Sequence, residues 1–384
     1  MNRILTGDAL GEMAKMEAES VHCVVTSPPY WGLRDYGVEG QLGLEPTPDL
    51  YIENLVQIFR EVRRVLRRDG TLWLNMGDSY AGSGKGIGSD HGKAVVDDAG
   101  YGSKVLIPFG LKPKDLCGIP WRVAFALQAD GWWLRSDIIW AKPNPMPESV
   151  TDRPTKAHEY VFLMSKAARY YYDQEAVREE IKDSNTGSCS ARPSGDSKTR
   201  DKEHWGIPHE GRGNVLRTYA TIKGANRKSV WTIPTAPFPE AHFATFPPAL
   251  VEPCIKAGTS EWGVCPECGK PWERIIERTD EKDTSAKGSR FDQGKTGARD
   301  GGDRTQAGER NLKATLGWRP GCTCGKEPTP ATVLDPFFGA GTVGLVAARL
   351  GRSFIGIELN PDYCEMARRR IEADAPLMTR VEVR

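Results

Sequence analysis

The sequence predicts an α/β fold built on a mostly parallel sheet, and two stretches of the chain predict it. Near the start, the apolar run VHCVV (21–25) is followed by an amphipathic helix pattern and then by a second apolar run, TLWLNM (71–76). Near the end, residues 332–358 pass through a strand pattern, a glycine-rich turn, a helix pattern and another strand pattern. Strands that alternate with helices are the repeating unit of parallel α/β sheets.

The first helix is expected within LYIENLVQIFREVRRVLRRDG (50–70). Its apolar residues recur at the three- and four-residue spacing of one helix face, at Leu55, Ile58, Phe59, Val62 and Leu66. The strand TLWLNM comes directly after this helix. The N-terminal region therefore predicts one complete strand, helix and strand unit.

A second group of elements follows in the middle of the chain. Residues 119–131 predict a helix, and LRSDIIWAKPNPMP (134–147) predicts a strand that ends in a proline-rich corner. HEYVFLMSKAARYYYD (158–173) predicts a further strand and turn, and PPALVEPCIKAG (247–258) an apolar helix.

Three segments have the composition of loops. Residues 81–104 are rich in Gly, Ser and charge, which predicts a mobile loop. Residues 184–230 carry nine Lys and Arg against four Asp and Glu, so they are either a phosphate-contacting region or a solvated insertion without a partner. Residues 279–311 contain one aromatic and almost no aliphatic residues, which predicts disorder or a long flexible hairpin.

Composition limits the class of protein. The formal net charge of +1 excludes a globally polycationic nucleic-acid binder but leaves room for local basic patches. No apolar run approaches a membrane span, and the N-terminus has no secretory h-region, so we expect a cytoplasmic protein with no membrane partner. Four of the nine cysteines form CxxC…CxC, which favours a reduced chain with a metal site over a disulfide framework.

The stretch TSPPYW (26–31) ends the first apolar strand in an unusual way. Each proline lacks a backbone donor and has a fixed φ, so two consecutive prolines cannot extend a central strand. The stretch therefore predicts a stiff corner at the end of a buried strand.

The C-terminal stretch predicts a nucleotide-type cofactor site. Gly339, Gly341 and Gly344 match GxGxxG and let a backbone approach a ligand, and Glu358 at the tip of the next strand can accept hydrogen bonds from ribose hydroxyls. The alternative is a tight turn with a structural role. Only 26 residues follow Glu358, so the rest of the sheet must come from N-terminal strands, and the order is circularly permuted relative to a dinucleotide-binding domain.

Together, TSPPYW and DPFFGAGT (335–342) resemble the amino-group DNA methyltransferases of the beta order, in which the catalytic motif precedes the S-adenosylmethionine motif. RILTGDAL (3–10) and HFATFPPALVEPCI (242–255) are similar to further segments of that family. The resemblance covers most of residues 1–181, 230–260 and 330–372.

The resemblance implies a Rossmann-like methyltransferase fold with a mixed, mostly parallel seven-stranded sheet and a circularly permuted motif order. The cysteine pairs add a small inserted zinc-ribbon-like element to this expectation. The expected division of the chain is 1–183 with the catalytic motif, 184–230 as a basic insertion for target recognition, 231–260 as a return to the core, 261–328 as the ribbon and 329–384 with the cofactor motif.

By resemblance, the methyl donor is S-adenosylmethionine, Glu358 binds its ribose, Asp8 approaches its adenine side, and the segment from His242 closes over its methionine end. Phe337 and Phe338 would supply apolar walls, with core packing as the alternative. The full expected cofactor set is Asp8, Thr26, His242, Phe243, Asp335, Pro336, Phe337, Gly339, Gly341, Thr342, Glu358 and Asn360.

The expected catalytic residues are Ser27, Pro28, Pro29 and Tyr30. An exocyclic amine of a base is a poor nucleophile, because its lone pair is delocalised into the ring. The Ser27 hydroxyl and the Pro28 carbonyl would accept the amine's hydrogens and aim the lone pair at the methyl group, while Tyr30 would stack on a base flipped out of double-stranded DNA. Direct attack needs no cysteine nucleophile, so Cys254 is expected to be a buried structural thiol.

The target base and the proton acceptor stay open. Serine before Pro-Pro favours cytosine N4, since a hydroxyl can both donate to the ring nitrogen and accept from the amine, and adenine N6 is the alternative. His158 and Glu159 are candidates for a general base or for a structural role. The GAGTVG match also leaves a nicotinamide-dependent oxidoreductase as a remote alternative, and a nucleic-acid-binding module with an inactive site as a third.

Cys265, Cys268, Cys322 and Cys324 predict a structural zinc site, because CxxC followed by Gly is a knuckle whose thiolates converge on one tetrahedral ion. A reduced cluster without metal and an iron-sulfur or redox site are the alternatives. The expected partner is double-stranded DNA. The enzyme would be either solitary or paired with a cognate restriction enzyme, and either a monomer or a homodimer.

Overall fold

The computed structural model describes residues 2–33, 35, 37–81, 110–180, 223–236, 246–283, 310–374 and 380–384. The chain divides into two compact units. The larger unit comprises residues 1–177, 228–276 and 315–384, and the smaller unit comprises residues 178–227 and 277–314.

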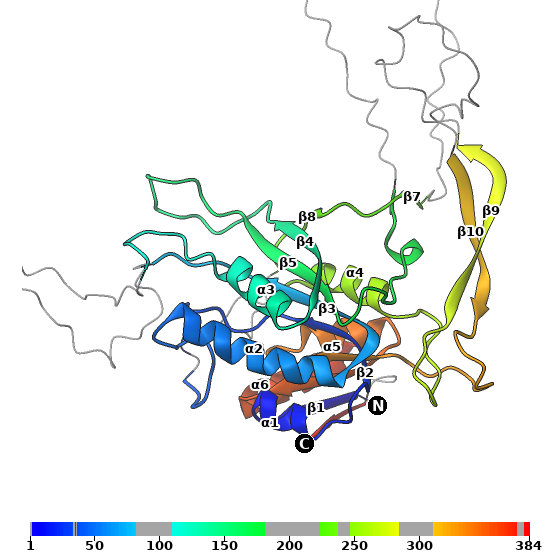
Figure 1. Cartoon of the computed structure of the whole chain (residues 1–384), viewed down its shortest axis with the longest axis horizontal. Coiled ribbons are helices and arrows are strands. Elements are labelled where there is room, and N and C mark those ends of the chain that lie inside the picture. Colours follow the sequence, from blue (N-terminus) through cyan, green and yellow to red (C-terminus); the bar gives the residue numbers. More distant parts are fainter. Residues whose placement is uncertain are drawn as a thin grey trace, which may run out of the picture. The chain divides into compact units, whose positions relative to one another are not determined.

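The helices and strands alternate along most of the chain (Figure 1). Their bounds are β1 Asn2–Thr6, α1 Ala9–Ala14, β2 Val21–Thr26, α2 Pro48–Val65, β3 Leu66–Met76, α3 Ile119–Ala129, β4 Trp133–Ala141, β5 His158–Ser165, the 3-10 helix η1 Glu175–Val177, β6 Glu179–Glu180, β7 Lys223–Ala225, β8 Val230–Thr232, α4 Pro248–Gly258, β9 Glu273–Asp283, β10 Arg310–Arg319, β11 Thr332–Asp335, α5 Thr342–Arg349, β12 Ser353–Glu358, α6 Pro361–Asp374 and β13 Val381–Val383.

The main sheet of the larger unit is mixed and mostly parallel, as expected. Its order among the described residues is β13-β1-β12-β11-β2-β3-β5-β4-β8, and β5 runs antiparallel to both of its neighbours. Within the described part of the chain the sheet has nine strands instead of the predicted seven. The two additional strands, β8 and β13, have three residues each and lie at the two edges.

Chain segments from both ends interleave in this sheet. The C-terminal strands β12 and β11 lie between the N-terminal strands β1 and β2, and β13 pairs with the outer side of β1. Figure 1 accordingly shows the two chain ends side by side at one edge of the sheet. The cofactor motif and the catalytic motif are thereby brought onto neighbouring strands.

Two hydrophobic clusters cover the two faces of the sheet. One contains residues of α1, α2 and α3, including Met13, Phe59 and Leu127, and the other contains residues of α4, α5 and α6, including Ile255, Val346 and Ala367. Three layers of helix, sheet and helix give the sheet a buried centre, which is the usual arrangement for parallel strands.

Helix α2 forms as the apolar spacing predicts. Thr47 caps it by accepting a hydrogen bond from the Leu50 N–H at 3.2 Å, and Pro48 occupies its first turn, where a missing donor costs nothing. Leu66, which was expected on the helix face, is extended and begins β3. Its side chain is still fully buried, so the apolar spacing identified the right environment and the wrong element.

The segments with loop composition have different outcomes. Residues 82–109 and 181–222 lie outside the described residues. These two ranges contain most of the predicted mobile loop and most of the basic insertion. The basic insertion ends in strands β7 and β8. Of the segment predicted to be disordered, residues 279–283 and 310–311 belong to β9 and β10, which pair with each other, and residues 284–309 are outside the described part.

A membrane span requires a long apolar helix. Within the described residues, no helix has that combination of length and hydropathy.

Candidate functional site

The predicted site residues gather at one edge of the main sheet. The strands β1, β12, β11, β2 and β3 are mutually parallel, so their carboxyl ends lie at this edge, where parallel sheets bind ligands. Asp8, Glu358, Asp335 and Ser27 follow or end four of these strands. Because β5 is antiparallel, its first residues, His158 and Glu159, come to the same edge.

A buried hydrogen bond connects the predicted catalytic motif with the predicted cofactor motif. The Thr26 hydroxyl donates to Asp335 Oδ1 at 2.7 Å, and both residues are almost fully buried. The Phe337 N–H donates to the same oxygen at 3.0 Å. Asp335 Oδ2 is buried and has no hydrogen-bond partner among the described residues, so this carboxyl group has one oxygen left for a ligand.

The surroundings of Asp335 also set its ionisation. Burial raises the pKa of this carboxyl group to about 7, and the charge of Glu358 contributes to the rise. The hydrogen bonds from Thr26 and Phe337 oppose it. A cation placed against Oδ2 would stabilise the charged form. The site is therefore suited to a positively charged group such as the sulfonium or ammonium of S-adenosylmethionine.

Glu358 ends β12 and is held by the glycine-rich turn. Its Oε2 accepts a hydrogen bond from the Gly339 N–H at 2.7 Å and its Oε1 accepts one from the Asn360 N–H at 2.9 Å. Gly339 and Gly341 have φ values of 48° and 74°, in the left-handed region that favours glycine. A carboxylate has further lone pairs, so Glu358 can still accept bonds from two hydroxyls of a ribose.

The other predicted cofactor residues have varied surroundings. Asp8 is exposed and accepts a hydrogen bond from the Gly11 N–H at 2.9 Å as the cap of α1. The Thr342 hydroxyl accepts one from Arg370 at 3.0 Å. Phe337 is half-buried, whereas Phe338 is buried and stacks on Phe354 with a centroid distance of 5.7 Å.

Phe338 therefore packs in the core, which was the alternative to an apolar wall of the site. Pro336 is also buried. His242 and Phe243 lie outside the described residues.

The Ser-Pro-Pro-Tyr corner carries a hydrogen-bonded cluster. Tyr30 donates its phenol proton to Glu159 Oε2 at 2.7 Å, and its oxygen lies 3.3 Å from the Ser27 hydroxyl. Asn75 Nδ2 lies 2.8 Å from the Tyr30 oxygen, 3.0 Å from Glu159 Oε2 and 3.3 Å from Ser27 Oγ. Lys142 completes the cluster through an ion pair with Glu159 Oε1.

The corner itself is braced from outside. The Pro29 carbonyl accepts a hydrogen bond from the Tyr51 hydroxyl at 2.8 Å, which attaches the corner to α2. The Tyr30 ring lies against Gly77, the residue that follows β3. A Cβ on Gly77 would come within 2.6 Å of this ring, so the position needs a residue without a side chain. The half-buried Tyr30 is thus packed against the protein and bonded at its hydroxyl, in addition to the base-stacking role expected for it.

Asn75 and Lys142 belong to this cluster and were not singled out by the sequence analysis. Glu159 was a candidate for a general base or for a structural role. The signal that places them is the antiparallel pairing of β5 with β3 and β4, in which Asn75 lies opposite Val161 and Trp140 opposite Glu159. Residue spacing alone carries no such signal.

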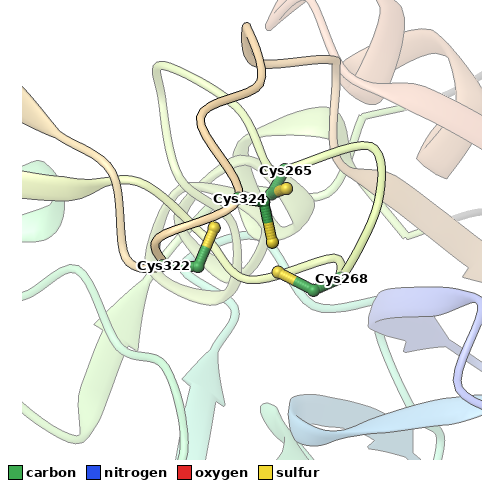
Figure 2. Close-up of side chains that lie close together, drawn as sticks. All are labelled: Cys265, Cys268, Cys322 and Cys324. Atoms are coloured by element: carbon green, nitrogen blue, oxygen red, sulfur yellow. The ribbon is translucent and has the colours of Figure 1, made fainter.

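The four cysteines expected to bind metal are together in the structure (Figure 2). All four Sγ atoms lie within 4.8 Å of one another. Tetrahedral Zn–S bonds of about 2.3 Å place sulfurs about 3.8 Å apart, so the cluster fits one zinc ion. A hydrogen bond from the backbone of Cys268 lowers the pKa of the Cys265 thiol to about 7, whereas bonds with neighbouring thiols raise that of Cys324 to about 12.

The prediction that Cys254 is a buried thiol agrees with its surroundings in α4. The residue is 1% exposed, and its Sγ lies 3.3 Å from the carbonyl of Leu250 in the preceding turn.

A glycine-rich turn and a Ser-Pro-Pro-Tyr corner meet at the carboxyl edge of one α/β sheet, the arrangement that the resemblance to the amino-group DNA methyltransferases implies. The DNA methylase family N6_N4_Mtase matches residues 21–265 and 328–369. The chain belongs to this family, the beta-class amino-group DNA methyltransferases, which use S-adenosylmethionine.

Two Type II methyltransferases align with nearly the whole chain. The Type II methyltransferase M.Cfr9I of Citrobacter freundii is 38% identical over 384 residues, which cover 98% of this chain and 90% of the relative. The Type II methyltransferase M.SmaI of Serratia marcescens is 40% identical over 369 residues, which cover 96% of this chain and 90% of the relative.

Two solved structures share the fold. The PvuII DNA methyltransferase (cytosine-N4-specific) has a TM-score of 0.52 at 15% identity and covers 100% of this chain and 95% of its own. TTHA0409 of Thermus thermophilus, a putative DNA modification methylase complexed with S-adenosyl-L-methionine, has a TM-score of 0.50 at 19% identity and covers 100% of both chains.

Proposed function

We propose that this protein transfers the methyl group of S-adenosylmethionine to N4 of cytosine at a specific site in double-stranded DNA. The observation that carries the proposal is the hydrogen bond of 2.7 Å between Thr26 and Asp335. Because Ser27 is the next residue after Thr26, this bond supports a role for Ser27 close to the proposed cofactor loop. The same reaction at adenine N6 is the alternative product, and nothing in the described site favours a hydride-transferring oxidoreductase.

The cofactor would be held by charge and by hydrogen bonds at the sheet edge. The free oxygen of Asp335 suits a cationic group, Glu358 suits the ribose hydroxyls, and Asp8 extends the same edge beyond β1. When bound, S-adenosylmethionine supplies an electrophilic methyl group. Residues 242–243 would close the methionine end.

The target amine would be prepared by the Ser-Pro-Pro-Tyr corner. A hydroxyl acceptor at Ser27 and a carbonyl acceptor at Pro28 would bind the amine's two hydrogens and favour a pyramidal nitrogen. Rigid placement is most of the catalytic effect, since the amine attacks directly. The preference for cytosine follows from the hydroxyl, which can donate to the ring nitrogen as well as accept from the amine.

The wider assignments belong to the same proposal. The two named relatives are Type II methyltransferases, which supports a role beside a cognate restriction enzyme. We propose that residues 184–230 and the ribbon of residues 261–328 recognise the target sequence. Residues 1–183, 231–260 and 329–384 would form the catalytic core, with a permuted motif order. The four-cysteine cluster would bind structural zinc. We expect the protein to act in the cytoplasm, where its DNA is.

The identity of the methylated nucleoside tests the proposed function. The purified protein is incubated with unmethylated genomic DNA and methyl-labelled S-adenosylmethionine, and the DNA is digested to nucleosides. Label in N4-methylcytosine is the expected result, and label in N6-methyladenine would show that adenine is the target base instead. Absence of label from DNAs of several base compositions would contradict the enzyme assignment.

Ser27→Ala tests the corner directly. The variant is expected to bind S-adenosylmethionine with the wild-type dissociation constant, because Thr26 and Asp335 are unchanged, and to lose at least about 99% of its turnover. Calorimetric titration with the cofactor and a filter-binding methylation assay measure the two quantities. Wild-type turnover in this variant would contradict the assigned role of Ser27.

A further inference from the structure

Methylation of an amine leaves one proton to be removed, and the Ser27 hydroxyl begins a continuous chain of hydrogen bonds that leads away from the site. Ser27 Oγ lies 3.3 Å from the Tyr30 oxygen, and Tyr30 donates to Glu159 Oε2 at 2.7 Å. The side chain of Glu159 is 15% exposed, so the chain ends at a group that water can reach.

The direction of these bonds follows from counting donors. Lys142 is an ammonium and occupies Glu159 Oε1, so the paired carboxylate acts only as an acceptor. Tyr30 has one proton, and it points to Glu159. The Tyr30 oxygen is then left to accept, and Ser27 can donate to it.

Asn75 reinforces this direction. Asn75 is 4% exposed, and the two protons of its amide nitrogen are shared among the Tyr30 oxygen at 2.8 Å, Glu159 Oε2 at 3.0 Å and Ser27 Oγ at 3.3 Å. Burial and the charge of Glu159 raise the pKa of the Tyr30 phenol well above its usual value, so Tyr30 stays protonated and able to donate. Ser27 has one hydroxyl proton, which it can donate either to the ring nitrogen of a cytosine, as the base is positioned, or to Tyr30. The relay uses the second orientation, in which Ser27 presents oxygen lone pairs to the incoming amine.

We propose that Glu159 is the terminal proton acceptor of the methyl transfer, reached from the target amine through Ser27 and Tyr30. The inference rests on the proposed function of the Ser-Pro-Pro-Tyr corner. It assigns to Glu159 a proton-accepting and positioning role, since this residue acts through Tyr30 and Ser27 and not by touching the base.

The transfer balances. The amine nitrogen forms a bond to the methyl carbon as the carbon-sulfur bond breaks, and the bonding pair stays on sulfur. The nitrogen, now positively charged, gives a proton to Ser27 Oγ. The Ser27 proton passes to the Tyr30 oxygen, the Tyr30 proton passes to Glu159, and water then removes it from the partly exposed carboxyl group.

Lys142 tunes the final acceptor. It pairs with Glu159, and its ammonium lies 4.3 Å from the centroid of the Trp140 ring, so it remains in place after the carboxylate is neutralised. Burial lowers the pKa of Lys156, whose Nζ donates to the Asp78 carbonyl at 2.6 Å, and the charge of Glu159 opposes that shift. The paired Lys142 cation favours prompt loss of the proton from Glu159 to water.

The test separates chemistry from binding in three variants. Glu159→Gln and Tyr30→Phe each remove one link of the chain while keeping side-chain shape, and the third variant carries both changes. Single-turnover methylation is measured with excess enzyme, and dissociation constants for the cofactor and for DNA are measured separately. Glu19→Gln is the matched control, because Glu19 pairs with Lys166 at 3.0 Å at the opposite end of β5.

Each single variant is expected to methylate about 100-fold more slowly than the wild type, in the range of lost acid-base catalysis, with both dissociation constants within about twofold. The double variant is expected to be no more than about threefold slower than either single variant, because one interrupted relay cannot be interrupted again. Glu19→Gln is expected to keep the wild-type rate.

Two outcomes would overturn the relay. Wild-type single-turnover rates in Glu159→Gln or Tyr30→Phe would do so, as would losses that multiply in the double variant, which would indicate two independent structural effects. Should Glu159→Gln fail to fold, Tyr30→Phe carries the same comparison. A parallel measurement on Ser27→Ala distinguishes failure of the proposed function from failure of the relay. Wild-type activity in Ser27→Ala contradicts the proposed catalytic corner. Loss of activity in Ser27→Ala together with wild-type activity in Glu159→Gln contradicts the relay alone.

Discussion

At the scale of single residues, Asp335 has the most informative surroundings in the site. One of its oxygens accepts two hydrogen bonds, the other is buried without a partner among the described residues, and the pKa of the group is about 7. This arrangement costs folding stability in the absence of a cation. Such a cost is common where a group is held ready for a ligand.

The first prediction concerns stability. Burial raises the pKa of Asp335 from 3.8 to about 7, so the folded protein holds this proton more tightly than the unfolded chain. Its stabilising contribution is full at pH values below 3.8 and is lost as the pH rises through about 7. At roughly 1.4 kcal/mol per pKa unit, the loss is on the order of a few kcal/mol.

Asp335→Asn, which cannot ionise, is therefore expected to melt at a higher temperature than the cofactor-free wild type at a pH of about 8, with a difference that shrinks as the pH falls and vanishes near 3.8. Thermal melts across this range measure the difference. Curves that stay parallel would contradict the assigned ionisation.

The second prediction concerns cofactor affinity. A proton on Asp335 competes with a cationic ligand, so the affinity for S-adenosylmethionine is expected to fall up to about tenfold per pH unit below about 7 and to level off above it. Isothermal titration at several pH values gives this slope. Asp335→Asn should bind weakly with no such slope, and a pH-independent affinity in the wild type would oppose contact between the cofactor's positive charge and this carboxyl group.

How far the site can be predicted from sequence depends on how local each signal is. Ser27, Asp335 and Glu358 each stand at a strand end inside a short motif, so sequence places them at the right edge. The contact between Tyr30 and Glu159 joins positions 129 residues apart. It depends on the antiparallel register of β5, which spacing within one chain does not specify.

At the scale of elements, the cysteine cluster joins two chain segments ahead of β11. Val264 and Thr329 exchange backbone hydrogen bonds of 2.8 Å, and the Arg67 guanidinium donates to the Cys268 carbonyl at 2.8 Å. Within the larger unit, the cluster therefore connects the start of β9 and the end of β10 to the first residues of β3. This contact lies on the side from which β11 enters the sheet.

The third prediction is that the purified protein contains one zinc ion per chain by elemental analysis. Removal of the ion by a chelator, or Cys265→Ser, is expected to lower the melting temperature by several degrees, because the closed four-thiolate site contributes folding energy. Cys254→Ser is the matched control for loss of a thiol and should keep the zinc. Stoichiometric iron, or no metal with unchanged stability after chelation, would contradict a structural zinc site.

Element prediction succeeds where a pattern is long. Helix α2 spans 18 residues with a continuous apolar face, and its position follows from that face. The edge strands β8 and β13 have only three residues each, too few to display a period of two, and were missed. Leu66 was assigned to the helix because its burial suits both the last turn of α2 and the first residue of β3.

At the scale of the whole molecule, strands β9 and β10 limit the length of the segment that can be deleted from the ribbon without cutting a strand. β9 ends at Asp283 and β10 begins at Arg310, so the segment predicted to be disordered, residues 279–311, overlaps both strands. The intervening residues 284–309 have one aromatic residue and almost no aliphatic ones.

The fourth prediction is that replacing residues 284–309 with a short glycine-rich linker keeps zinc content and methylation near wild-type values, because a hairpin tolerates changes of loop length at small entropic cost. Elemental analysis and the methylation assay report on the two properties. A variant that loses both would show that this segment is needed for the fold of the ribbon, and loss of methylation alone would indicate a role in DNA contact.

The interleaved strand order has a consequence for synthesis of the chain. β11 lies between β12 and β2, and the residues Thr26 and Asp335 that meet across this pairing are 309 positions apart. At 5–20 residues per second, a ribosome needs roughly 15–60 s to travel that distance. During this interval one edge of β2 has no strand to pair with and is open to other chains. Completion of the central sheet therefore waits for the last part of the chain, and an interrupted product would carry an unprotected edge through the middle of its future core.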